Sequence, residues 1–346
     1  MRSGANTTAA TVDYTTADGS AKQQSDYEFA AGRLTFNPAD TTQTITILIN
    51  EDGFAESTES FTVNLSNPTG GALLGPDSAT TVNITDNDAS TSTTTNVIDD
   101  AATFVCEHYH DFLNRQGDSG GQNYWTSQIT QCANDVDCIK RQRIGVSAAF
   151  FIEQEFQQTG FYVYRIFKSS LGRRPTYVEF MTDRSRLLAG SNLDAEKVAY
   201  TQEFVQRGEF TGKYSTSLDG PGFVDALILN VKNNSGVDLT SHRSELITEY
   251  NNGSSQTDSR ARVLRKLVEY DEFKNAEFNR AFVLAQYFGY LRREPDDSGY
   301  NFWLNVLNSQ PSNFRAMVCA FITSNEYQDR FGATRTHNNT ECSGSP

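Results

Sequence analysis

The pattern of apolar and polar residues changes its period near residue 99. Before that point, short runs alternate apolar and polar side chains and are separated by turn residues such as Gly, Pro, Asn and Asp. After it, apolar residues recur every three or four positions, as on one face of a helix. The sequence therefore predicts a multidomain β + α protein: a small antiparallel β-sandwich, then an all-α helical repeat domain.

The first region holds five runs that are alternating or β-rich. They cover residues 11–16, 33–36, 42–49, 60–65 and 80–84. Strands this close together, with hairpin-length connections, favour an antiparallel sandwich, which we place at residues 1–88. The uncharged, Ser/Thr-rich stretch at 89–98 is expected to form an extended linker.

The helical domain is expected to span residues 99–332 and to be followed by a polar tail at 333–346. Its loops carry Gly, Asn, Asp and Pro, and the pattern indicates an assembly of about a dozen helices. The segments with helical periodicity are 101–114, 144–156, 161–171, 194–204, 223–231, 242–250, 259–270, 277–291, 300–307 and 313–330.

Part of this domain is repeated. Residues 113–125 (LNRQGDSGGQNYW) and 291–303 (LRREPDDSGYNFW) carry Leu, Arg, Asp, Gly, an aromatic residue and Trp at the same offsets, and a weaker copy starts at Leu171. A second signature, aromatic-x-x-x-x-Glu-aromatic, follows each copy, at 150–156, 204–210 and 321–327. A period of roughly 55 to 60 residues predicts a helical array of about four units.

The repeated motif has a mechanical interpretation. Asp296 or Ser298 is expected to cap the helix that follows, because a side-chain oxygen there accepts from backbone N–H groups. We expect Phe302 and Trp303 to enter the core, and Arg293 to bond carbonyls at the end of the preceding helix. A metal ion held by this loop is the less favoured alternative, since one or two carboxylates make a poor calcium cage.

Charge is distributed unevenly along the chain. The net charge is −14, which argues against a nucleic-acid partner. Residues 1–98 hold 3 Lys+Arg and 12 Asp+Glu, a balance of −9, and the longer remainder has a balance of −5. No apolar run of about 18 residues occurs, so we expect no membrane span. The acidic front part favours cations as partners.

The acidic residues of the front part lie at strand ends rather than on strand faces. The candidates for a metal site are Asp26, Glu51, Asp52, Glu56, Asp86 and Asp88, and Glu59 belongs to the same acidic run as Glu56. Carboxylates gathered at one end of a sandwich repel each other unless a cation neutralises them. Ca²⁺ accepts about six to eight oxygen ligands in flexible geometry and suits such loops. The alternative is that these are ordinary solvated turn residues.

Three strings carry a family resemblance: VDYTTADGSAKQQSDYEFAAGRLTF, ITILINEDGFAESTESFTVNLSNPTGGALLG and TTVNITDND. Over about residues 2–88 they resemble a Calx-β domain, a calcium-binding β-sandwich. The resemblance implies the same six ligands, Asp26, Glu51, Asp52, Glu56, Asp86 and Asp88. Glu51 stands where the family often has Asp, and its longer side chain would change the cage.

The resemblance also implies a first strand, with a Glu-containing turn, before the segment MRSGANTT. We therefore expect an N-terminally truncated domain. The alternative is a sheet edge completed by strand donation from another molecule, which would build a filament.

The repeated segments resemble DUF4214, an uncharacterised helical repeat domain of secreted and surface-layer-associated bacterial proteins, over roughly residues 100–332. A degenerate unit at 223–273 completes the set. The family is similar to phycobilisome linker modules, which implies packing against other proteins.

All five cysteines follow residue 100. Cys132 and Cys138 enclose a short polar run, and we expect a local disulfide there, in an oxidising, extracytoplasmic setting. Cys319 has two candidate partners, Cys342 and Cys106, and the sequence does not choose between them.

No catalytic motif is present, and the protein is not expected to be an enzyme. The sequence has no GxSxG elbow, HExxH pair or Walker loop. In the segment CEHYH, Cys106 and His110 lie four residues apart on one helix face, whereas His108 points away. Two ligands fall short of a zinc set, so we expect these histidines to have surface or half-buried roles.

Together these observations predict a structural or adhesive protein that is extracellular or on a bacterial cell surface. We expect Ca²⁺ to stabilise it, and its function to be self-association into a layer or filament, or association with another surface protein. The alternative is a secreted carbohydrate-binding or carbohydrate-degrading accessory protein whose partner is a surface polysaccharide. The aromatic residues after position 100 would then include exposed stacking platforms.

Overall fold

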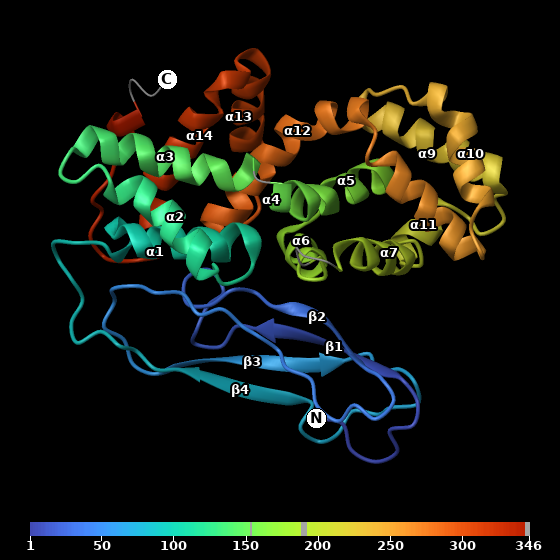
Figure 1. Cartoon of the computed structure of the whole chain (residues 1–346), viewed down its shortest axis with the longest axis horizontal. Coiled ribbons are helices and arrows are strands. Elements are labelled where there is room, and N and C mark those ends of the chain that lie inside the picture. Colours follow the sequence, from blue (N-terminus) through green and yellow to red (C-terminus); the bar gives the residue numbers. More distant parts are fainter. Residues whose placement is uncertain (153, 188–191, 343–346) are drawn as a thin grey trace. The chain divides into compact units, whose positions relative to one another are not determined.

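The computed structural model describes residues 1–152, 154–187 and 192–342. The chain divides into two compact units. Unit 1 comprises Met1–Ile152, Gln286–Arg293 and Ser309–Pro346, and unit 2 comprises Glu153–Ala285 and Glu294–Asn308. The strands all lie at the start of unit 1, in the blue part of the chain in Figure 1.

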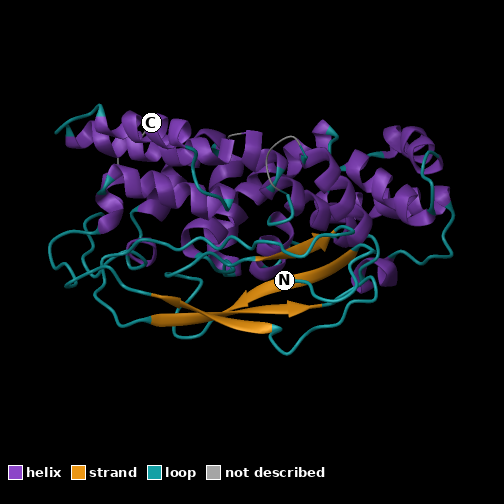
Figure 2. Ribbon diagram, turned by 60° about the horizontal axis from the view of Figure 1, so that its bottom comes forward, coloured by secondary structure: helices purple, strands orange, loops and turns teal. Residues whose placement is uncertain are grey.

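A four-stranded antiparallel sheet forms the front of unit 1, in the order β2-β1-β3-β4. The strands are β1 (Ala10–Ala17), β2 (Ala31–Phe36), β3 (Glu59–Ser66) and β4 (Ala79–Ile84). The register places Tyr14 opposite Gly32 in β2 and Leu65 in β3, and Glu59 opposite Ile84. The predicted fold class is confirmed: the strands of the front part form an antiparallel sheet, and the regular elements that follow them in the described chain are helices (Figure 2).

The predicted strand at 42–49 is wrong. Within the described residues this segment makes one isolated bridge, between Tyr27 and Ile49, and belongs to no strand. Its apolar side chains Ile45 and Ile47 still pack on the sheet core, where the rings of Tyr27 and Phe61 stack at 4.1 Å. Alternation in the sequence therefore indicates that side chains pack on a sheet face. A strand needs, in addition, a neighbouring strand with which its backbone forms a continuous series of hydrogen bonds.

The helices of unit 1 surround an aromatic core. They are η1 (Val97–Asp99), α1 (Ala101–His108), η2 (Tyr109–Leu113), α2 (Ser119–Thr130), α3 (Val136–Ile152), η4 (Tyr287–Leu291), η5 (Pro311–Asn313), α14 (Phe314–Ile322), α15 (Asn325–Gln328) and η6 (Asn339–Cys342). The predicted helix at 313–330 is broken, because Ser324 caps α15 by accepting from the Tyr327 N–H.

Unit 2 is helical throughout its described residues. Its elements are α4 (Gln154–Gln158), α5 (Gly160–Leu171), α6 (Tyr177–Arg184), α7 (Leu193–Phe204), α8 (Gly208–Lys213), α9 (Gly220–Ser235), η3 (Thr240–His242), α10 (Arg243–Asn251), α11 (Gln256–Leu267), α12 (Asp271–Gln286) and α13 (Asp297–Ser309); the last residues of α12 and α13 belong to unit 1. Helices α2, α6 and α8 were not predicted: α2 and α8 have few apolar residues, and α6 is only eight residues long. No helix within the described ranges has the length and apolar character that a membrane crossing requires.

The motif copies begin helices as predicted. Asp118 Oδ1 accepts from the Gly121 N–H at 2.9 Å at the start of α2, and Asp296 Oδ1 accepts from the Gly299 N–H at 2.8 Å at the start of α13. In the weaker copy, Thr176 and Glu179 form a capping box at the start of α6. The oxygen-rich loop therefore serves as a helix cap.

The motif arginines explain why two signatures recur together. Arg293 donates to both carboxylate oxygens of Glu326, and Arg173 to both of Glu209. Each glutamate belongs to the downstream aromatic-x-x-x-x-Glu-aromatic signature. Arg293 was expected to bond helix-terminal carbonyls, and this ion pair is a role that the prediction missed.

The same arginines also contact a ring six residues upstream. Arg115 lies 5.0 Å from the ring centre of Tyr109, and Arg293 lies 5.6 Å from that of Tyr287. Arg173 lies 5.3 Å from the ring centre of Phe167. The cation–π contact is a third shared feature of the repeat.

One core prediction for the motif is wrong. Phe302 is 59% exposed, and the equivalent Tyr124 is 56% exposed. The inward positions of α13 are Tyr300 and Leu307, seven residues apart on one face, and Phe302 lies on another face. Each exposed ring makes an edge contact with the neighbouring Trp.

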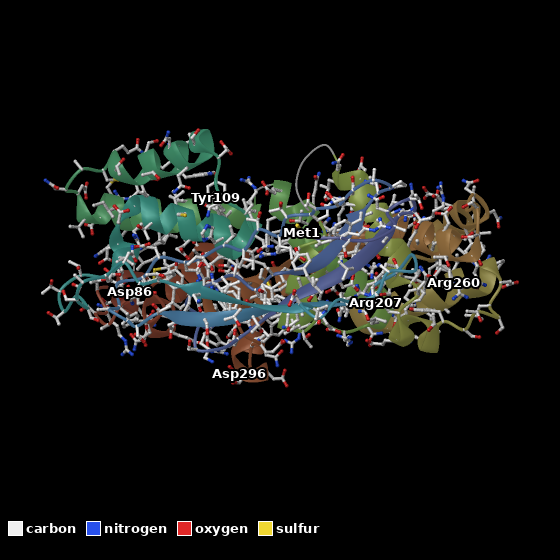
Figure 3. All side chains as sticks on the ribbon, turned by 90° about the horizontal axis from the view of Figure 1, so that it is seen from below. Met1, Asp86, Tyr109, Arg207, Arg260 and Asp296 are labelled. Carbon is white, nitrogen blue, oxygen red and sulfur yellow. A yellow bond between two sulfur atoms is a disulfide. The ribbon has the colours of Figure 1, made fainter. Side chains whose placement is uncertain are left out.

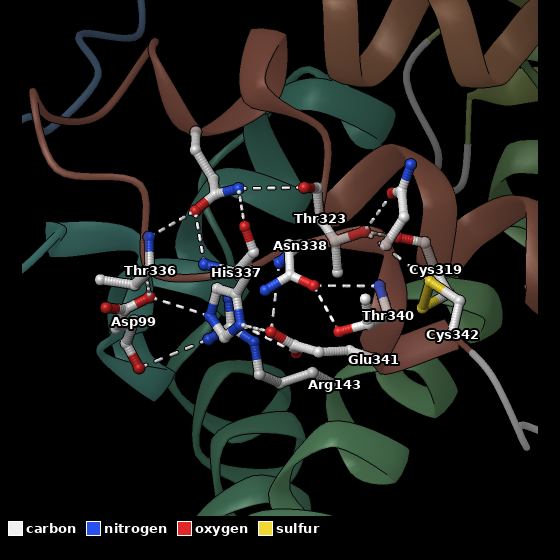
Figure 4. A network of polar contacts seen from close by, with 12 residues as sticks. Asp99, Arg143, Cys319, Thr323, Thr336, His337, Asn338, Thr340, Glu341 and Cys342 are labelled. Atoms are coloured by element: carbon white, nitrogen blue, oxygen red, sulfur yellow. Dashed lines mark hydrogen bonds and ion pairs between the residues drawn. A yellow bond between two sulfur atoms is a disulfide. The ribbon is translucent and has the colours of Figure 1, made fainter.

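Two disulfides are present in unit 1. Cys132 pairs with Cys138 as predicted, and Cys319 pairs with Cys342, which leaves Cys106 as the free thiol. The second disulfide joins the polar tail to α14. His337 of the tail contacts both Asp99 and Glu341 at 3.0 Å, as Figure 4 shows. The described part of the tail is therefore packed against the helices.

Candidate metal centre

The loops at one end of the sheet bring the acidic segments together. Glu59 is the first residue of β3 and lies opposite Ile84, the last residue of β4. Asp86 follows two residues later and so lies beside the start of β3; it is labelled in Figure 3. Asp26 directly precedes Tyr27, whose ring is fixed on Phe61 in the core. The sheet register and this stacking place three separate loops next to each other.

Five of the six predicted ligands line one open pocket: Asp26, Glu51, Asp52, Glu56 and Asp86. Oxygen atoms of Asp26, Asp52 and Glu56 all lie within 4.8 Å of one another. Asp88 contributes through its backbone, since its N–H donates to Asp86 Oδ1 at 2.9 Å. Glu59 also lines the pocket and was left out of the predicted set, although it belongs to the same acidic run.

Backbone hydrogen bonds fix several of these carboxylates. Asp86 Oδ2 accepts from the Glu56 N–H at 2.7 Å, Asp26 Oδ2 from the Lys22 N–H at 2.6 Å, and Asp52 Oδ1 from the Phe54 N–H at 2.8 Å. The hydrogen bonds that Asp86 accepts from the N–H groups of Asp88 and Glu56 lower the pKa of its carboxyl. The carboxylates are held in place before any cation binds.

The pocket contains more negative charge than its surroundings can stabilise. Burial, followed by repulsion from the nearby Glu56, Asp26 and Asp88, raises the pKa of Asp52 to about 6, although its hydrogen bond from the Phe54 N–H acts in the opposite direction. The pKa of Glu59 is raised to about 7, first by burial and then by its hydrogen bond to Asp26 and by repulsion from that carboxylate. A cation between these groups would relieve the repulsion.

The donor set favours calcium over other metals. The lining side chains with metal-binding atoms offer oxygen ligands from three separate loops, with no His or Cys among the described residues of the pocket. Zinc prefers nitrogen and sulfur donors, and magnesium requires a compact octahedron that retains several waters. The residues present therefore fit Ca²⁺.

A second group of possible ligands lies deeper in unit 1. Glu28, Glu107 and His110 are buried, and one atom of each lies within 4.8 Å of the others. Two guanidinium groups already neutralise this region: Arg292 pairs with Glu28 and with Asp111 (2.8 Å), and Arg330 pairs with Asp111 (2.9 Å). We interpret the group as a salt-bridge cluster. Glu28, Arg292 and Arg330 are far in the sequence from Glu107, His110 and Asp111, and sequence reasoning missed the cluster.

The prediction of surface or half-buried histidines in CEHYH is wrong. His108 and His110 are both buried, His108 between the Phe104 carbonyl and the Ser147 hydroxyl, each at 2.7 Å. The helix turns inward here because the sheet domain covers this face: His110 Nδ1 lies 3.4 Å from Asn50 Oδ1. The predicted pairing of Cys106 with His110 is present, at 3.7 Å.

An antiparallel β-domain with carboxylate loops at one end is the architecture of a divalent-cation-binding module. Residues 1–88 match the family model of the Calx-beta domain, and residues 264–331 match that of the Domain of unknown function (DUF4214). Both families that the motifs resemble are therefore matched, each over its own stretch of the chain. The Calx-beta domain is a calcium-binding domain. That residues 100–263 hold further DUF4214 units stays a prediction.

Two sodium/calcium exchangers match a short stretch of the chain. Sodium/calcium exchanger 1 of Mus musculus is 42% identical over 66 residues, which are 19% of this chain and 7% of the exchanger. Sodium/calcium exchanger 2 of Homo sapiens is 48% identical over 56 residues, 16% of this chain and 6% of the exchanger. The chain thus spans less than a tenth of these proteins.

Two solved structures are also similar. The apo-form Calx CBD1 domain is 35% identical and covers 25% of this chain and 76% of its own, with a TM-score of 0.25. The calcium binding domain CBD12 of CALX1.1 is 36% identical and covers 25% and 37%, also with a TM-score of 0.25.

Proposed function

We propose that residues 1–88 bind Ca²⁺ through Asp26, Glu51, Asp52, Glu56, Asp86 and Asp88, with Glu59 as an additional ligand, and that bound calcium stabilises the folded chain. The observation that carries the proposal is the convergence of Asp26, Asp52 and Glu56 oxygens within 4.8 Å. Calcium binds the assembled loops and not the unfolded chain. The free energy of unfolding therefore rises with calcium, by about 2.7 kcal/mol at a hundredfold excess over Kd.

Thermal unfolding with calcium and with a chelator tests this proposal. We expect calcium to raise the melting temperature of the wild type, and the double variant Asp86→Ala/Asp88→Ala to lose that rise. Asp77→Ala is the matched control, because Asp77 is an exposed acid outside the pocket. If calcium did not change the melting temperature of the wild type, the proposal would be refuted.

We further propose that the protein is an extracellular or cell-surface structural component that associates with itself and catalyses no reaction. The disulfides Cys132–Cys138 and Cys319–Cys342 support an oxidising compartment. Strands β2 and β4 each have one neighbour in the described sheet, and such edges accept a strand from another copy. Light scattering with calcium and with chelator checks this: calcium-dependent assemblies are expected, and a monomer under both conditions contradicts it.

A second candidate function is carbohydrate binding, which the exposed rings of Tyr124 (56%) and Phe302 (59%) favour. Aromatic faces of this kind can stack on sugar rings. Depletion of the protein by insoluble polysaccharide, lost in Tyr124→Ala or Phe302→Ala, would support this function. Leu229→Ala is the control, because Leu229 is similarly exposed (56%) but not aromatic.

A further inference from the structure

Arg292 occupies a position where the repeat otherwise has a small residue. Its backbone is left-handed (φ 50°), as are those of Asn114 (φ 51°) and Gly172 (φ 80°) at the same place in the other copies. A left-handed backbone conformation is unfavourable for a residue that carries a side chain. The arginine is nevertheless present, and its side chain is 1% exposed.

The guanidinium of Arg292 lies between two loops of the sheet domain. It donates to the carbonyl oxygens of Gln23 at 2.9 Å and of Tyr27 at 3.4 Å, and it lies 3.5 Å from Asn50 Oδ1. Asn50 in turn donates to the carbonyl oxygens of Ser25 at 2.8 Å and of Asp26 at 3.0 Å. Arg292 therefore joins the loop that carries Asp26 to the loop that carries Glu51 and Asp52.

Other contacts hold the same two loops. The Gly53 N–H donates to the Phe331 carbonyl at 3.0 Å, and Gln24 Nε2 donates to the Leu291 carbonyl at 3.4 Å. The charge of Arg292 is already neutralised by Glu28 and Asp111. Arg292 consequently holds the loops chiefly through hydrogen bonds, while its charge is paired with Glu28 and Asp111.

We propose that Arg292 is a positioning residue of the calcium site and couples calcium binding to the packing of η4 against the sheet domain. The inference rests on the proposed calcium binding. If the two loops already have the spacing of the calcium-bound state, little conformational entropy is lost when the ion binds. The affinity for calcium is therefore higher. Because coupling between two equilibria is reciprocal, calcium must strengthen the packing of residues 287–293 by the same factor.

Calorimetric titration of the full chain with calcium, well below its melting temperature, tests the inference. Arg292→Gly restores the residue type that another copy has at this position, and we expect about a tenfold weaker Kd. Arg293→Ala is the matched control: Arg293 pairs with Glu326 and should leave the Kd within about twofold. A purely structural role would lower the calcium-free melting temperature of Arg292→Gly and leave its Kd unchanged, which would overturn the inference alone. A wild type that binds no calcium would overturn the proposed function and the inference with it.

Hydrogen exchange of the wild type provides a test that needs no variant. Calcium should slow exchange in residues 50–53 and also in residues 287–293. Slower exchange in the loop with unchanged exchange in residues 287–293 would refute the coupling.

Discussion

The substitution Asp52→Asn should have opposite effects on stability in the calcium-free and calcium-bound states of the proposed site. The substitution removes one negative charge and keeps an oxygen that can accept from the Phe54 N–H, now at 2.8 Å. In the wild type, burial and the neighbouring Glu56, Asp26 and Asp88 raise the pKa of Asp52 from its usual 3.8 to about 6. The variant therefore removes a charge that the calcium-free fold disfavours and the calcium-bound fold requires.

The sign and size of the effect follow from the pKa. A carboxyl group whose pKa is raised by folding binds its proton more tightly when folded, so stability falls as the pH rises from about 4 to about 6. The full shift of roughly two pH units corresponds to about 3 kcal/mol, which we reduce to about 1 kcal/mol because Asp52 is partly exposed to solvent. Without calcium at pH 7.5, Asp52→Asn should therefore be about 1 kcal/mol more stable than the wild type. At pH 4 the two should be equal.

Calcium should reverse this order. The wild type gains about 2.7 kcal/mol at a hundredfold excess of calcium over Kd, whereas the variant lacks a ligand. Hydrogen exchange of the β1 and β3 amides is the appropriate assay, because a multidomain chain need not unfold in one step. Asp77→Asn is the control: Asp77 is an exposed acid just before β4 and outside the pocket, so this variant should leave stability at pH 7.5 unchanged with or without calcium. If Asp52→Asn changed stability equally in calcium and in chelator, the reasoning would be refuted.

Three further predictions concern the helical part. Arg173→Ala removes two bidentate ion pairs, with Glu179 and Glu209, and should lower the free energy of unfolding of unit 2 by about 1–2 kcal/mol in urea titrations. Arg243→Ala is the control: it removes an exposed pair with Asp225 and should lower that free energy by less than about 0.5 kcal/mol. Burial lowers the pKa of His108 to about 3. The folded protein should therefore lose stability as the pH drops below about 6.5, by about 2 kcal/mol at pH 5. In hydrogen-exchange measurements, His108→Gln should make stability depend less on pH over this range. Replacing both Cys319 and Cys342 by Ala removes their disulfide and should lower the free energy of unfolding by about 3 kcal/mol. Melting of the variant, and of the wild type with and without reductant, checks this, and an unchanged melting temperature would contradict it.

Features set by neighbouring residues were predictable. The caps at Asp118 and Asp296, the Cys132–Cys138 disulfide and four of the five strands depend on spacing within a few residues. The acidic loops were also identifiable, because turn residues place their carboxylates at strand ends. Glu59 was missed because it opens a strand, and only the pairing of β3 with β4 brings it beside Asp86.

Features that depend on distant partners were not predictable from one sequence. The extended segment at 42–49 has the composition of a strand, but its neighbours decide whether a ladder forms. Phe302 is apolar and helical, but the orientation of α13 places it in solvent. His108 became a core residue because α3 and η4 supply Ser147 and Tyr290 around it.

The sequence by itself determined the two domain families, the acidic loops and the repeated helix caps, because each depends on residues close together in the chain. Tertiary structure alone decided that Arg292 reaches Glu28, 264 residues away, and Asp111, 181 residues away. A buried charge is stable only beside its partners, and folding, not spacing, brings those partners together. The link between the acidic loops and the helices therefore became visible only in three dimensions.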